Sequence, residues 1–79
     1  MNQDHVSIWN RILELVQQSV EQKHYNTWFI PIRPIQLDGL VLTLEVPNEF
    51  FLAHLESNYL DILKDSLRSV LGQRAKIEY

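Results

Sequence analysis

The segment between Pro47 and Gly72 constrains the fold most, because it has the features of one long helix with a defined start and end. Asn48 is a good N-cap residue, and Gly72 stands just past the expected end, where glycine is favoured. The sequence therefore predicts a helix that ends at about Leu71, with a possible kink or break near Ser57-Asn58.

A helical wheel of this segment separates its two adjacent phenylalanines. With Leu52 as origin and about 100° per residue, one apolar stripe collects Leu55, Tyr59, Ile62, Leu63, Leu67 and Val70. Phe51 falls about 80° from the centre of the stripe, and Phe50 falls about 180° from it. We therefore expect Phe51 at the edge of the core and Phe50 in solvent. An exposed Phe50 either packs on the preceding loop as part of a cap or anchors a binding partner, since aromatic residues dominate interface hot spots.

The first part of the chain predicts two helices in succession. Asp4 is a plausible N-cap for a helix from about Val6 to Gln22. Its apolar residues recur at spacings of three and four: Trp9, Ile12, Leu13, Val16 and Val20. A short second helix, which Pro31 ends, presents three aromatic residues on one face: Tyr25, Trp28 and Phe29.

Ile8 and Leu15 lie off the centre of the first stripe and form a second, narrower apolar strip on the same helix. They either broaden the face that enters the core or form a surface for self-association. The pattern alone leaves both possibilities open.

Three segments predict strands. Ile32 to Leu37 is the first, and Pro34 in it requires an edge position or a bulge. Asp38-Gly39 is a strong signal for a two-residue hairpin turn. The next strand alternates cleanly, with one face formed by Leu40, Leu42, Leu44 and Val46. A last short strand would direct its apolar side chains inward: Ala75, Ile77 and Tyr79.

The predicted order is α-α-β-β-α-β, which is typical of an α+β two-layer domain with a three-stranded sheet packed on helices. With 79 residues, the chain has room for one domain, residues 1–79, and not for two.

Composition excludes several functions. The seven lysines and arginines are scattered along the sequence and the net charge is −3, which argues against gripping duplex DNA. There are no cysteines, the three histidines lack metal-ligand spacing, and no serine lies in a nucleophile elbow. We therefore predict neither enzyme activity nor a metal or cofactor site. Apolar runs are far shorter than the roughly 18 residues that span a membrane, and a cytoplasmic location is expected.

Several of these features together resemble a known family. Trp9, the sequence YNTWF at 25–29, the Asp38-Gly39 turn and the sequence VPNEFFLAHLESNYL at 46–60 are similar to the N-terminal domain of the bacterial replication initiator DnaA. The resemblance covers essentially the whole chain and includes the order of the elements. It implies a KH-like fold without the GxxG loop with which other KH domains grip phosphates.

The resemblance also implies functions and site residues. Family members associate with one another, recruit the replicative DNA helicase to the origin, dock regulatory proteins and bind single-stranded DNA weakly. By position, Trp9 matches the self-association tryptophan, and Phe50 matches an aromatic residue implicated in helicase and single-strand contact. Trp28 and Asn48 join Phe50 in a patch that regulators use in some relatives. His24 stands where some relatives have an acidic helicase contact. The alternative function is that of a KH-like single-stranded nucleic-acid-binding module.

Overall fold

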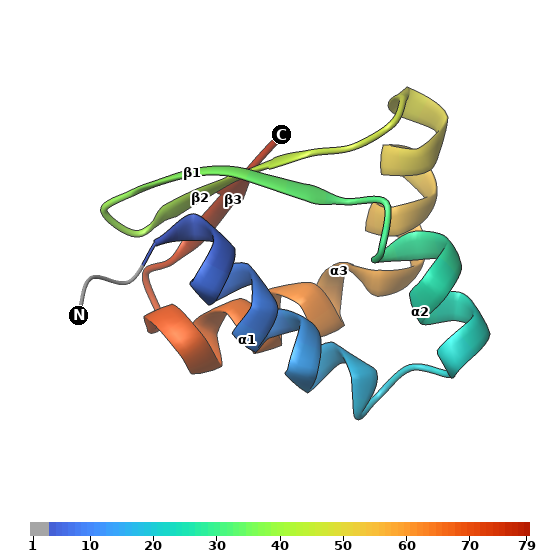
Figure 1. The fold of residues 1–79 in the computed structure, drawn as a ribbon, viewed down its shortest axis with the longest axis horizontal. Coiled ribbons are helices and arrows are strands. Elements are labelled where there is room, and N and C mark those ends of the chain that lie inside the picture. Colours follow the sequence, from blue (N-terminus) through green and yellow to red (C-terminus); the bar gives the residue numbers. More distant parts are fainter. Residues whose placement is uncertain (1–3) are drawn as a thin grey trace.

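The computed structural model describes residues 4–79, which form three helices and three strands in the expected order (Figure 1). These elements are α1 (His5–Gln17), α2 (Gln22–Trp28), β1 (Arg33–Asp38), β2 (Val41–Glu45), α3 (Glu49–Leu71) and β3 (Lys76–Glu78). The predicted α+β class is confirmed.

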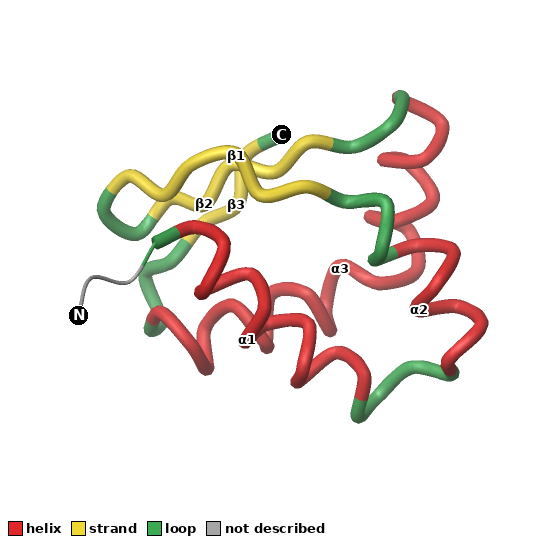
Figure 2. Tube along the Cα trace, in the orientation of Figure 1, coloured by secondary structure: helices red, strands yellow, loops and turns green. Residues whose placement is uncertain are grey.

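The three strands form one mixed sheet in the order β1-β2-β3. β2 pairs with β1 in the antiparallel sense and with β3 in the parallel sense. The parallel pair follows from the connection, because α3 carries the chain from the end of β2 back to the start of β3. Figures 1 and 2 show α1 and the later turns of α3 on the same side of the sheet. Both β1 and β3 are edge strands.

The β1–β2 hairpin confirms the expectation for Pro34 and shifts the turn by one residue. Pro34 lies on an edge strand, and the pairing register shifts between Pro34 and Gln36. Asp38 pairs with Val41, so the loop is Gly39-Leu40 and not Asp38-Gly39. Gly39 has a φ of 61°, and among the described residues only glycines have a positive φ, so the φ of Leu40 is negative. A positive φ at the first loop residue alone is the pattern of a type II′ turn. Leu40 therefore belongs to the turn and is exposed.

The first helix is shorter than predicted, because α1 ends at Gln17 and not at Gln22. The N–H groups of Gln18 and Ser19 donate to carbonyls three residues back, at 3.2 and 3.0 Å, which tightens the turn that follows the helix. At the other end, the Asp4 carboxylate accepts a hydrogen bond from the Ser7 N–H at 2.8 Å, as an N-cap should.

Helix α3 has the predicted ends. The Asn48 side chain accepts a hydrogen bond from the Phe51 N–H at 2.7 Å, and Gly72 follows the last turn with a φ of 104°. The helix is continuous, but its first turns and its later turns run in different directions (Figures 1 and 2). The Asn58 side chain donates to the His54 carbonyl at 3.0 Å, and such contacts with the helical ladder bend helices. The sequence signal near Ser57-Asn58 thus marks a bend and not a break.

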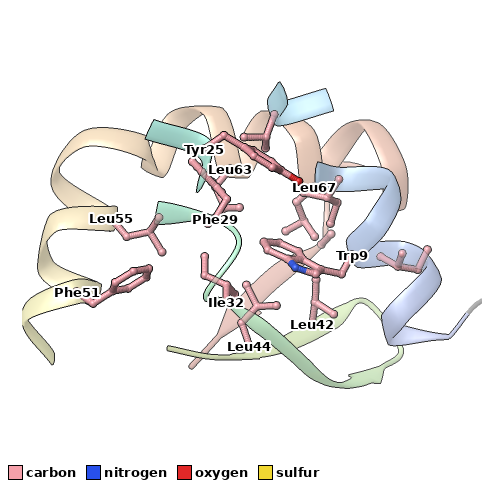
Figure 3. Close-up of a cluster of buried hydrophobic side chains, with 14 residues drawn as sticks. Trp9, Tyr25, Phe29, Ile32, Leu42, Leu44, Phe51, Leu55, Leu63 and Leu67 are labelled. Atoms are coloured by element: carbon pink, nitrogen blue, oxygen red, sulfur yellow. The ribbon is translucent and has the colours of Figure 1, made fainter. Parts of the chain in front are cut away.

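The core lies between the sheet and the helices (Figure 3). Leu42 and Leu44 of β2 are buried, and Leu63 and Leu67 of α3 belong to the same cluster. Phe51, expected at the edge of the core, is buried, and Leu52, the origin of the wheel, is half-buried. One prediction for side-chain direction is wrong. Tyr79 is 43% exposed at the end of the last strand and does not face inward as Ala75 and Ile77 do.

Candidate functional site

Aromatic side chains join the end of α2 to the beginning of α3. Trp28, the last residue of α2, lies nearly parallel to the His54 imidazole, with ring centroids 3.7 Å apart and an interplanar angle of 15°. The Trp28 ring also contacts Phe51, with centroids 5.0 Å apart and planes at 45°. Trp28 is half-buried, because two residues of α3 cover its ring in part.

Phe50 is the most exposed large apolar residue of the described chain, with 80% of its surface accessible. It lies in the first turn of α3, next to Phe51 in the sequence but about 100° around the helix from it. Its predicted exposure is confirmed. The cap at this end is made by Asn48 and the Phe51 N–H, and a ring that is four-fifths exposed covers little of the preceding loop.

The other residues expected at the site lie around the same junction. Asn48 is exposed, and its side chain is engaged in the cap of α3. His24 is half-buried on α2, four residues before Trp28 and hence on the same face of that helix. We call Phe50, Asn48, Trp28, His24 and His54 together the aromatic surface.

His54 is the member of the aromatic surface that the sequence analysis did not single out. It is half-buried by its stacking on Trp28. A signal was present in the sequence, because His54 follows Phe50 by four residues and so shares its side of the helix.

The residues expected for self-association lie elsewhere, on α1. Ile8 is fully buried and Trp9 is 2% exposed, so both belong to the core (Figure 3). The expectation that Ile8 lies on a surface strip is therefore wrong, and Ile8 instead broadens the core face, as the other interpretation proposed. Leu15 is half-buried and packs less completely. Val6, at 47% exposure, is the large apolar residue that α1 presents to solvent.

Hydrogen bonding and burial shift the pKa of two side chains in the first part of the chain. The Ser7 hydrogen bonds hold the pKa of Asp4 below its usual value, and burial raises the pKa of Tyr25. Among residues 4–79, no three histidine or acidic side chains gather as metal ligands do. In the same range, no helix has both the length and the apolar composition needed to cross a lipid bilayer.

Comparison with known proteins gives a consistent match. The family model described as the DnaA N-terminal domain matches residues 6–69. The chain is similar to proteins named chromosomal replication initiator protein DnaA: 39% identical over 75 residues in Bacteroides fragilis and 42% over 72 residues in Chlorobaculum tepidum. These matches cover 95% and 91% of the chain but only 16% and 15% of the relatives. In Flavobacterium psychrophilum the identity is 35% over 79 residues, 100% of the chain and 16% of the relative.

Proposed function

The chain belongs to the DnaA N-terminal domain family, and from that premise we propose that it is a non-enzymatic protein-interaction module of a cytoplasmic replication initiator. Its partners would be the replicative DNA helicase, regulatory proteins and other initiator molecules. The aromatic surface would dock the helicase and the regulators, and α1 would contribute to a weak homodimer.

The exposure of Phe50 is the observation that carries this proposal. A ring that is 80% exposed in the free domain still has most of its apolar area to bury against a partner. Aromatic anchors of this kind account for much of the binding energy of protein interfaces.

The surroundings of Phe50 support the same role, because they fix its backbone before a partner arrives. The Asn48 cap holds the first turn of α3, and the contact between Phe51 and Trp28 holds that turn against α2. A preorganised anchor loses little conformational entropy on binding, which raises affinity.

The position of Trp9 bears on how the domain would associate with itself. Trp9 is almost completely buried, so its part in self-association would be indirect, through the shape of α1. Direct contacts would come from residues with accessible surface on that helix, such as Leu15 and Val6.

Single-stranded DNA would be at most a weak ligand of the aromatic surface. An exposed Phe50 ring can stack on a base, as aromatic residues do in single-strand-binding proteins. Tight binding also requires cations along the phosphate backbone, whereas the net charge of this chain is −3. A protein partner therefore fits this surface better than nucleic acid.

Site-specific crosslinking tests the docking proposal. A photoreactive phenylalanine analogue replaces Phe50 in one variant and Ile35, an exposed residue of β1, in the control variant. Irradiation with the purified replicative helicase should give a crosslinked product at position 50 and none at position 35. Equal crosslinking at both positions, or none at position 50, would reject the proposed surface.

A further inference from the structure

A second surface lies between the later turns of α3 and β3. A groove of about 780 Å³ runs there, and its apolar lining includes Leu60 and Leu67 of α3 and Ile77 of β3. Phe50 is in the first turn of α3, whereas the groove is lined by α3 from Glu56 onward and by the segment beyond its last turn, and it shares no residue with the aromatic surface. The two surfaces are therefore separate.

The groove gathers most of the basic residues of the chain. Of the seven lysines and arginines, four line it: Lys64, Arg68, Arg74 and Lys76. Glu56 is the one acidic side chain in its lining. These cations are scattered along the sequence, but in the folded domain four of them line one groove. The chain turns back after Gly72, so two cations from α3 and two from the segment after it line the same groove.

The groove also runs along an open edge of the sheet. β3 pairs with β2 on one side only, and the Lys76 N–H donates to the Leu40 carbonyl at 2.9 Å. Because successive residues of a strand direct their backbone groups to opposite sides, the N–H and C=O of Ile77 face away from β2. Consecutive residues of the strand, Lys76 and Ile77, both line the groove, as expected along an edge rather than beneath one face.

We propose that this groove binds an extended acidic segment of a partner protein, which adds as a fourth strand beside β3. Backbone hydrogen bonds to Ile77 would hold the segment, as in other cases of strand addition. Its alternate apolar side chains would contact Leu60 and Ile77, and its carboxylates would face the four cations.

The geometry favours a peptide over a nucleic acid as the occupant. A strand edge offers backbone donors and acceptors that match another polypeptide. A single-stranded nucleic acid is usually held by several aromatic side chains on which successive bases stack, whereas Tyr79 is the only aromatic residue in the lining.

A titration with synthetic peptides tests the proposal. The probe is a fluorescent eight-residue peptide in which aspartate alternates with valine, and a lysine–valine peptide is its control. Binding to the domain is followed by fluorescence anisotropy at low and high salt. We expect saturable, salt-sensitive binding of the aspartate peptide only. Equal binding of both peptides, or of neither, would overturn the proposal.

Two peptides with methylated backbone nitrogens test the strand geometry. One carries N-methyl groups on the odd residues and the other on the even residues, so only one of them blocks the edge that faces β3. We expect their dissociation constants to differ by about tenfold or more, as for loss of backbone hydrogen bonds in a strand pair. Equal affinities would show that the peptide does not bind as a strand.

Charge-reversal variants test the location. The groove variant combines Arg74→Glu with Lys76→Glu, and the matched control combines Arg11→Glu with Lys23→Glu, which changes the net charge equally. All four residues are exposed. We expect the groove variant to weaken binding by about tenfold and the control to change it little. Equal weakening would reject the groove.

Oligothymidylate tests the nucleic-acid alternative. If it binds more tightly than the peptide, and the groove variant weakens its binding, the groove is assigned to nucleic acid instead. The Phe50 variants should leave peptide binding unchanged, so failure here would be distinct from failure of the helicase proposal.

Discussion

Replacing Phe50 by alanine should separate binding from folding. Because 80% of the residue is accessible in the free domain, its removal takes little from the core. We expect the free energy of unfolding to change by no more than about 0.5 kcal/mol, as at ordinary surface positions. The same substitution should weaken helicase binding by about 2 kcal/mol or more, which is roughly thirtyfold in dissociation constant.

The size of the binding loss follows from the accessible area of Phe50. A buried aromatic side chain covers about 150–250 Å², and most of that area is still accessible in the free domain. At about 25 cal/mol per Å², covering it would contribute roughly 3–5 kcal/mol before the costs of association. Desolvation of neighbouring polar groups and loss of side-chain freedom reduce this figure, so about 2 kcal/mol is the least we expect.

Asn48→Ala is the matched comparison, because it removes the cap in the same turn. Losing the 2.7 Å bond to the Phe51 N–H should cost about 1 kcal/mol of stability. For each variant, a denaturant midpoint and a helicase-binding isotherm are measured at a temperature where both variants are folded. If Phe50→Ala is destabilised as much as Asn48→Ala and yet binds helicase normally, the anchor interpretation is refuted.

Three further outcomes are expected. Leu63→Ala should lower the unfolding free energy by roughly 2–5 kcal/mol, because Leu63 is fully buried; a thermal midpoint within a degree or two of wild type would contradict this. The isolated domain should show a weak monomer–dimer equilibrium in analytical ultracentrifugation that Leu15→Ser weakens, and a strict monomer at millimolar concentration would refute it. An oligonucleotide titration in about 150 mM salt should give a dissociation constant no tighter than tens of micromolar, whereas nanomolar binding would favour the nucleic-acid function.

The features predicted correctly from the sequence are mostly those that local rules determine. The N-caps formed by Asp4 and Asn48 depend on residues three apart, and both hydrogen bonds are present. The exposure of Phe50 follows from its angular position on one helix, on the side opposite the centre of the apolar stripe. Pro34 lies at an edge and beside a register shift because it lacks the N–H that a central strand needs.

The features that sequence reasoning missed depend on neighbours distant in the chain. The sequence left open whether Ile8 enters the core; it is buried because α1 packs against both β1 and α3, and a stripe on a wheel does not reveal how many elements will surround it. The stacking of His54 on Trp28 joins two helices, and the basic groove joins α3 to β3. None of these contacts has a spacing that a local pattern could detect.

The buried direction of α3 rotates along the helix, which is how one helix can serve two surfaces. Its buried apolar residues Phe51, Leu55, Leu63 and Leu67 are separated by multiples of four. At about 100° per residue, each step of four turns the buried direction by roughly 40°, so the direction rotates by roughly 160° from Phe51 to Leu67. The buried side of the first turns therefore meets α2, where Phe51 contacts Trp28, while that of the later turns belongs to the core beneath the sheet. Phe50 faces solvent in the first turn of the helix, and the proposed peptide groove opens along its later turns and β3.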